Sequence, residues 1–184
     1  MHWIVTLRDT VRVPPDRFGE PLERVVADIL RKTYEGVVDK DLGIVVAIVD
    51  VKEIGIGRII MGDGASYHDV VFDALTYRPE LNEVVLGEVV EIVNFGGFVR
   101  LGPLDALVHI SQVMDDYVSY DDKKGVLSGK ESKRSLKEGD KVRARIVSVS
   151  MKRDSRGKIG LTMRQPGLGK LEWLKEEGGK GGKS

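Results

Sequence analysis

The sequence predicts an α+β protein in which a helix on a small, mostly antiparallel sheet is followed by an all-β, five-stranded barrel of the OB type. Two observations lead to this fold class. Within the first 80 residues, one amphipathic helical stripe lies among segments that resemble strands. The following part of the chain contains short alternating segments, most of them separated by turn residues. We therefore expect two small domains.

The first domain is predicted over residues 1–80 and begins with a strand at residues 3–13, which ends at two prolines that cannot continue a strand ladder. Apolar residues then recur with the period of a helix, so a helix is predicted between Pro21 and Gly36. Three further strands are predicted at residues 42–51, 58–61 and 67–77. The first of these three is a nearly continuous run of Ile and Val, which predicts a strand covered on both faces.

A predicted loop in this domain has an unusual composition. Ile54 and Ile56 alternate with Gly55 and Gly57, in a stretch that precedes a strand. Isoleucines between glycines in a loop suit insertion into a partner protein. A tight hairpin with both isoleucines turned inward fits the sequence equally well.

The second domain is predicted over residues 81–166, after Pro79 breaks the strand pattern. Its five strands are predicted at residues 83–94, 97–101, 106–110, 141–149 and 158–164. Residues 115–136 are polar and charged, and they are predicted to form a long connection with at most a single helical turn. Residues 167–184 are predicted to form a short helix over 168–177 and a disordered tail rich in Gly and Lys.

Strand alternation predicts which side chains of the barrel face away from its core. If Val99 points inward, the aromatic ring and the cation on either side of it point outward, and the same rule applies to the later strands. Thr162 and Arg164 are likewise expected to face outward. Two glycines leave open space beside two phenylalanines, so a flat base could stack there. The candidate nucleic-acid-facing residues are Phe95, Phe98, Arg100, His109, Arg143, Arg145 and Lys158.

The charge distribution supports a local, not a global, attraction for polyanions. The formal net charge is zero, which argues against a protein that coats nucleic acid through bulk positive charge. Residues 123–164, however, hold 14 Lys and Arg against 4 Asp and Glu. A solvated face explains a charge run by itself, but cations combined with aromatic rings predict a groove for single strands, with weak sequence preference and affinity that falls with salt.

Several classes of site are not supported by the sequence. Without cysteine there is neither a disulfide framework nor a thiolate metal site, and a reducing cytoplasm fits best. No apolar run reaches the length of a membrane span. The three histidines are scattered, and the carboxylate pairs Asp115-Asp116 and Asp121-Asp122 fall in a polar stretch typical of solvated side chains. We predict no catalytic residue, no metal and no cofactor.

The second domain resembles the S-one RNA-binding domain family. The stretches that carry this resemblance are GEVVEIVNFGGFV, GPLDALVHIS, GDKVRARIV and KIGLTMR. The resemblance implies that Phe95, Phe98 and His109 line an RNA-binding face. Where the family often has an Asp ending the fourth strand and an Arg opening the fifth, this sequence has Ser148 or Ser150 and Lys158.

The whole chain resembles the archaeal RNA polymerase stalk-subunit family called E-prime, the counterpart of the seventh subunit of the eukaryotic nuclear enzyme. The matching stretches include DTVRVPPDRFGEPL, YEGVVDKDLGIVVAI, GDGASYHDVVFDALTYRPELNEVV, ISQVMDDYVSYD and LTMRQPGLGKLEWL. The resemblance implies an N-terminal ribonucleoprotein-like domain, a heterodimer with the polymerase's F subunit, docking on the polymerase core and binding of nascent single-stranded RNA, with the active centre in other subunits. The residues it implies for core docking are Ile54, Gly55, Ile56, Gly57, Gly62, Asp63 and Gly64. An alternative assignment is an RNA-binding cap subunit of an exosome-like RNA-processing complex.

Overall fold

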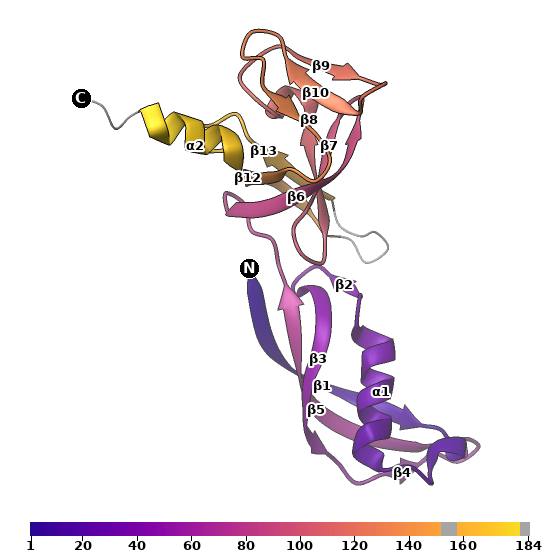
Figure 1. The fold of residues 1–184 in the computed structure, drawn as a ribbon. Helices are drawn as coiled ribbons and strands as arrows, with labels where there is room; N and C mark the ends of the chain where they lie inside the picture. Colours follow the sequence, from indigo (N-terminus) through magenta and orange to yellow (C-terminus); the bar gives the residue numbers. More distant parts are fainter. Residues whose placement is uncertain (152–157, 181–184) are drawn as a thin grey trace. The chain divides into compact units, whose positions relative to one another are not determined.

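The computed structural model describes residues 1–151 and 158–180, with side chains up to residue 176. The chain forms two compact units, one over Met1–Arg78 and one that begins at Pro79 (Figure 1). The first contains a helix on a sheet and the second a closed barrel, so the predicted α+β fold class is confirmed. Neither of the two α-helices found in the described part of the chain has the length and apolar character needed to span a membrane.

The N-terminal unit is built around one long central strand. The sheet has the order β1-β5-β3-β2, every pair is antiparallel, and β4 also pairs with β5. The strands are β1 (His2–Val13), β2 (Val38–Asp39), β3 (Gly43–Ile54), β4 (Arg58–Ile59) and β5 (Ser66–Tyr77). The two-residue strand β2 was not predicted from the sequence.

Helix α1 (Leu22–Tyr34) covers one face of this sheet. Its residues Val25, Val26 and Leu30 are buried against a core to which β5 contributes Phe72. The prediction that β3 is covered on both faces is wrong, because its second half is largely exposed. Three register shifts against β5 interrupt the alternation of β3, so its continuous apolar run does not report two buried faces.

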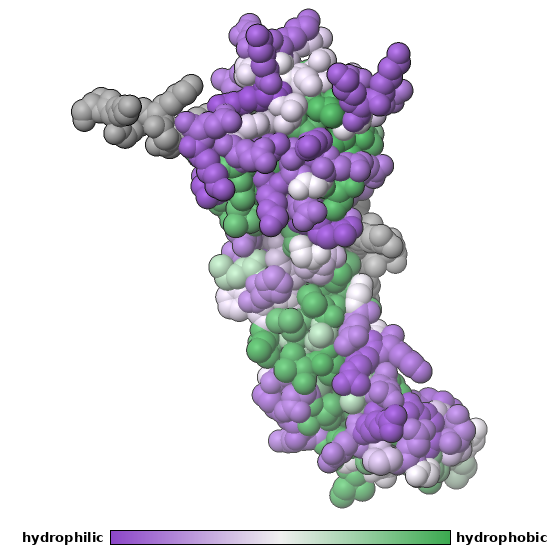
Figure 2. Space-filling model, viewed as in Figure 1, coloured by the Kyte–Doolittle hydropathy of each residue, from purple (hydrophilic) through white to green (hydrophobic). Residues whose placement is uncertain are grey.

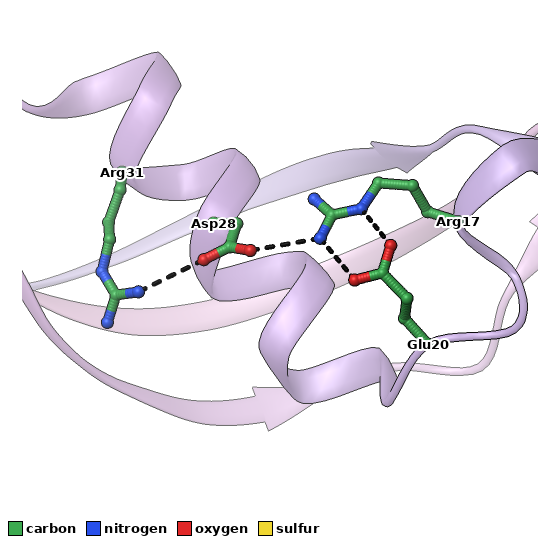
Figure 3. Close-up of polar contacts among 4 residues, drawn as sticks. All are labelled: Arg17, Glu20, Asp28 and Arg31. Carbon is green, nitrogen blue, oxygen red and sulfur yellow. Dashed lines mark hydrogen bonds and ion pairs between the residues drawn. The ribbon is translucent and has the colours of Figure 1, made fainter.

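An ion-pair network fixes the chain between β1 and α1, where the short 3-10 helix η1 (Pro15–Arg17) lies (Figure 3). Arg17 donates two hydrogen bonds of 2.8 Å to the carboxylate of Glu20 and one of 3.1 Å to Asp28. Arg31 reaches the other carboxylate oxygen of Asp28 at 3.3 Å. The Arg17 guanidinium holds the pKa of Asp28 below its ordinary value, so this network favours the ionised carboxylate.

The second unit is a five-stranded barrel with one additional short strand. The order β13-β8-β7-β6-β12 closes on itself through β12 and β13, and β14 adds to β12. All these pairs are antiparallel except β8 with β13. The strands are β6 (Val84–Val93), β7 (Gly96–Arg100), β8 (Asp105–His109), β12 (Lys141–Ser150), β13 (Lys158–Thr162) and β14 (Gly169–Lys170).

The segment predicted as a long irregular connection is a small sheet. Strands β9 (Val118–Asp121), β10 (Val126–Gly129) and β11 (Ser135–Leu136) pair in the order β11-β10-β9. The carboxylate of Asp116 accepts bonds from the backbone N–H groups of Glu131 and Ser132 at 3.0 and 2.9 Å, which fixes the turn between β10 and β11. The prediction of a loop failed because these strands have only two to four residues, too few to show a period, although Leu127 and Leu136 on them are buried.

Helix α2 (Leu171–Lys180) follows the barrel, so the predicted short helix is present, although it begins later and continues into the segment predicted as a disordered tail. Residues 181–184 of that tail lie outside the described residues. Two contacts hold the start of α2 to the barrel unit: Trp173 is buried, and the ammonium of Lys170 lies 3.0 Å from the carboxylate of Asp140. Both Lys170 and Asp140 are buried.

Candidate nucleic-acid interface

A depression of about 510 Å³ lies on the outer surface of the barrel. It is bordered by β7, β8, β12 and β13, four strands that the barrel closure makes neighbours. Strand pairing places Phe98 beside Leu107, Leu107 beside Gly160, and Gly160 beside Ser148. Other residues that line the depression include His109, Val147 and Lys158. The depression therefore combines an aromatic ring, an imidazole and an ammonium on a mainly apolar floor.

Phe98 on β7 lines this depression, and Phe95, which does not line it, packs against Phe98. The rings of Phe95 and Phe98 meet edge to face, with centroids 6.2 Å apart and planes at 87°. Phe95 is 47% exposed, whereas Phe98 is half-buried. Edge-to-face contact fixes the orientation of both rings and leaves aromatic surface available to solvent. Rings held in this way can serve as stacking platforms for bases.

Close strand packing explains two glycines near these rings. Gly96 has φ of +155°, and a Cβ there would lie 2.1 Å from the carbonyl oxygen of Val108. A Cβ on Gly160 would lie 2.3 Å from Oγ of Ser148. At Gly96 only glycine fits, because the clash would be with the backbone of β8, whereas at Gly160 it would be with a side-chain hydroxyl that can rotate away.

His109 is held by Ser111, two residues further on, in helix η2 (Ile110–Gln112). Its Nδ1 accepts a hydrogen bond from the backbone N–H of Ser111 at 3.3 Å and lies 2.8 Å from the Ser111 hydroxyl. Because Nδ1 is the acceptor, the neutral ring carries its proton on Nε2. His109 therefore offers an N–H donor suited to a phosphate, ribose or base oxygen.

The predicted cations are not all in one place. Lys158 lines the depression, whereas Arg100 is paired with Asp105 at 3.1 Å beside it. Arg143 and Arg145 do not line it. They lie on β12 next to the exposed β6 residues Leu86 and Val84, respectively.

The structure adds residues to the wall of the depression that the sequence did not identify, and it buries one residue that was expected to be exposed. Leu107 and Val147 form apolar parts of the depression. A register shift after Ile146 also leaves Ser148 exposed, which strict alternation does not predict. Thr162 was expected to face outward, but it is buried and donates a 2.8 Å hydrogen bond to the side-chain oxygen of Gln112.

The N-terminal unit contains a second exposed feature, the tip loop, which we define as residues 55–64. Ile56 is 92% exposed, while Ile54 packs against the core, so the hairpin with both isoleucines turned inward is not formed. Ile59, Ile60 and Met61 are also exposed and were not singled out from the sequence. Figure 2 shows hydrophobic surface at this end of the unit, where β4 lies in Figure 1.

The predicted docking residues of the tip loop differ in their surroundings. Gly55, Gly57, Gly62 and Gly64 are exposed. Asp63 has a structural role, since Arg12 donates two hydrogen bonds to it at 2.8 and 2.7 Å and the Tyr67 hydroxyl donates a third at 2.6 Å. The bonds from Arg12 hold the pKa of Asp63 far below its ordinary value. Across the described ranges, no group of three or more His, Asp or Glu side chains is placed to hold a metal ion.

Two family models match this chain, one in each unit. The model described as "SHS2 domain found in N terminus of Rpb7p/Rpc25p/MJ0397" matches residues 8–64. The model described as "S1 RNA binding domain" matches residues 78–163.

Two curated relatives match almost the whole length of the chain, and a third matches about half of it. The chain is 49% identical over 175 residues to "DNA-directed RNA polymerase subunit Rpo7" of Saccharolobus shibatae, with 95% of this chain and 97% of the relative covered. It is 46% identical over 177 residues to the protein of the same name from Sulfolobus acidocaldarius, covering 96% and 97%. It is 35% identical over 89 residues to "DNA-directed RNA polymerase III subunit rpc8" of Schizosaccharomyces pombe, covering 48% of this chain and 44% of the relative.

Proposed function

The chain belongs to the Rpo7 family of DNA-directed RNA polymerase subunits, and we propose that within the polymerase it binds the exiting single-stranded RNA through its S1 barrel. The family that the sequence resembles is thereby confirmed, and the chain is a non-catalytic subunit of that enzyme. In this role it pairs with the polymerase's F subunit, docks on the polymerase core and supports initiation and elongation in the cytoplasm.

The observation that carries the RNA-binding proposal is the depression that brings Phe98, His109 and Lys158 together. A half-buried ring can stack on a base, an imidazole N–H can bond an oxygen, and an ammonium attracts phosphate. None of these contacts reads a base edge in a defined geometry. RNA of many sequences should therefore bind, as an exit path requires.

The test of the RNA path replaces Phe98 and His109 by Ala in the assembled polymerase. Stacking is worth about 1–3 kcal/mol per base, so we expect crosslinking of nascent RNA to the barrel to fall at least about tenfold. The matched control is Phe18→Ala, which removes an exposed ring from the N-terminal unit. Crosslinking equal to that of wild type, with both variants folded, would contradict the proposed surface.

Docking on the core is proposed for the tip loop because its exposed isoleucines and methionine form an apolar end on an otherwise polar loop. Ile56→Asp should release the chain from the polymerase core while leaving its fold intact, with Phe18→Asp as the control. Affinity purification followed by mass spectrometry measures this outcome. Recovery of nuclease-ring subunits in place of polymerase subunits would favour the alternative role as an RNA-processing cap.

A further inference from the structure

A second cleft of about 300 Å³, which we call the arginine cleft, lies on the barrel unit. The segments that follow η2 and β13 form much of its lining, together with Arg134 and with Trp173 of α2. Its apolar residues are mostly buried, so the lining that solvent reaches is mainly polar. The exposed charged and amide side chains there are Asp115, Arg164 and Gln165. The arginine cleft therefore suits a charged ligand better than an apolar one.

The arginine cleft adjoins the depression proposed to bind RNA (the RNA depression), and the two meet at Gln112. Gln112 lines the RNA depression, and the residue after it lines the arginine cleft. Leu161 lines the depression and Met163 the cleft, and the Met163 N–H donates a 2.8 Å bond to the Gln112 carbonyl. Lys158 and Arg164 are six residues apart, so at most about 20 Å of extended chain separates the depression from the cleft. An OB fold binds roughly 4–16 nucleotides, so one RNA strand is long enough to occupy both.

An exchangeable ion pair lies in the arginine cleft, between Arg164 and Asp115. The Arg164 side chain is 46% exposed and that of Asp115 is 78% exposed. Within the described residues, neither side chain makes any other hydrogen bond or ion pair. An ion pair exposed to water contributes little to stability. The Arg164 guanidinium can therefore exchange this carboxylate for another anion at small cost.

The neighbouring Asp116 shows by contrast what a structural carboxylate does in this segment. Asp116 accepts hydrogen bonds from the backbone N–H groups of Glu131 and Ser132 and so fixes a turn. In the described part of the chain, Asp115 accepts no bond from the backbone, and its partner Arg164 lies 49 positions away. The place of Asp115 is therefore not explained by holding a turn.

We propose that the arginine cleft extends the RNA path, and that Asp115 occupies the place of an RNA phosphate on Arg164 until RNA arrives. A guanidinium binds carboxylate and phosphate through the same planar fork of N–H donors, so a phosphate can replace the carboxylate directly. Arg134 adds positive potential to the cleft, where its guanidinium carbon lies 5.5 Å from the centroid of the Trp173 ring. The inference rests on the proposed function, because it takes the ligand to be the RNA held by the RNA depression.

The exchange makes Asp115 a competitor of RNA. A phosphate that binds Arg164 has to displace the carboxylate, which lowers the affinity of the extended path and leaves RNA confined to the depression unaffected. An exit path has to release the RNA that it binds, and a competitor within the protein meets that need. An acidic protein segment could also reach the arginines, but the cleft offers it little exposed apolar surface, whereas continuity with the depression favours RNA.

Binding of oligouridylates of two lengths to the full chain tests the proposal. An RNA of about 4 nucleotides can be held by the RNA depression alone, whereas one of about 16 can reach the arginine cleft. Asp115→Asn should tighten binding of the long RNA about two- to fivefold and leave binding of the short RNA unchanged. The matched control is Glu138→Gln, which removes an exposed carboxylate that lines neither the depression nor the cleft. Equal effects of the two substitutions overturn the proposal.

A double-mutant cycle separates exchange at Arg164 from general repulsion by Asp115. Arg164→Met should weaken binding of the long RNA about threefold to tenfold and lower the slope of log affinity against log salt concentration by about 0.7. Adding Asp115→Asn to Arg164→Met should bring no further gain, because the carboxylate then has nothing to compete for. A gain of the same size as in the wild-type background overturns the exchange.

Photocrosslinking carries the test into the assembled polymerase. A photoreactive amino acid in place of Gln165, which lines the arginine cleft, should crosslink nascent RNA, as should one in place of Val147, which lines the RNA depression. The same group in place of Glu138 should not. Crosslinks from Val147 but not from Gln165 overturn this inference and leave the proposed function intact, whereas RNA crosslinks from neither position overturn both. Crosslinks from Gln165 to another subunit in place of RNA assign the cleft to a protein and also overturn the inference.

Discussion

The Nδ1 atom of His68 lies 2.9 Å from the carbonyl oxygen of Gly55 and joins strand β5 to the start of the tip loop. A carbonyl can only accept, so Nδ1 carries the proton and Nε2 accepts the Ser66 hydroxyl at 3.1 Å. His68 is buried, and a Cβ on Gly57 would approach its Cε1 to 2.7 Å. The loop backbone and the imidazole are therefore in direct contact, and this contact positions the exposed isoleucine between the two glycines.

Gly57→Ala should destabilise the N-terminal unit, because the new methyl group would displace the buried His68 ring. Overpacking of this kind costs about 1–3 kcal/mol. Denaturation followed by Trp3 fluorescence in a Trp173→Phe background reports on this unit alone. Gly19→Ala is the matched control, since a Cβ there meets nothing within 4 Å. Equal stability of the two variants would show that His68 is not packed as described.

Tyr34→Phe should change how stability depends on pH in alkaline solution. Burial, together with the hydrogen bond that the Tyr34 hydroxyl donates to Asp9, raises the Tyr34 pKa from 10.0 to about 12. The folded state thus holds this proton more tightly than the unfolded state, and the stabilisation is complete below pH 10 and is lost as the pH rises toward 12. The difference in unfolding free energy between wild type and Tyr34→Phe should shrink over that interval. A constant difference would contradict the assignment.

Lys170→Met should destabilise the barrel unit by about 3 kcal/mol, because it leaves the Asp140 carboxylate buried without its partner. Burial lowers the pKa of Lys170, but its hydrogen bonds to Glu172 and Asp140 raise it more, so the ammonium form is retained. The double variant Lys170→Met with Asp140→Leu should recover most of the loss. A double-mutant cycle by denaturation, followed by Trp173 fluorescence, measures the coupling. Additive losses would show that the two charges do not depend on each other.

Lys158→Met should weaken RNA binding at every sequence by a similar factor and reduce its salt dependence. Each phosphate contact to a single strand contributes about 0.7 to the slope of log affinity against log salt concentration. The slope for Lys158→Met should fall by about that amount. The control Lys141→Met removes an exposed cation of the same barrel that does not line the depression. Equal slopes for both variants would place the phosphate path elsewhere.

The sequence allowed the fold class to be predicted because each domain has a local pattern of its own. Apolar residues at helical spacing predict α1. Alternation of inward-facing and outward-facing residues predicts β7 and the first half of β12. The sequence did not show the sheet of β9, β10 and β11, because strands of two to four residues are too short to display a period. Nor could it show that β3 is interrupted by three register shifts. The pairing of β3 with β5 decides these shifts, and local periodicity does not record them.

The candidate site was only partly predictable for the same reason. Alternation identified Phe98, His109 and Lys158 as outward-facing, but their meeting in one depression depends on barrel closure. Thr162 was expected to be exposed, but it is buried and bonded to Gln112, which lies in a different part of the sequence. Arg143 and Arg145 carry the right charge but lie against β6, outside the depression, so their role in RNA binding stays a prediction.

The pairing of β12 with β13 closes the barrel, and the depression is lined by strands on both sides of this pairing. A polynucleotide can bind in the depression only while β12 and β13 are paired. RNA binding and barrel closure are therefore thermodynamically linked. At an RNA concentration of about 100 times Kd, binding raises the free energy of opening the barrel by about 2.7 kcal/mol. In the proposed role, bound transcript therefore stabilises the closed barrel, and this stabilisation is lost when the transcript dissociates.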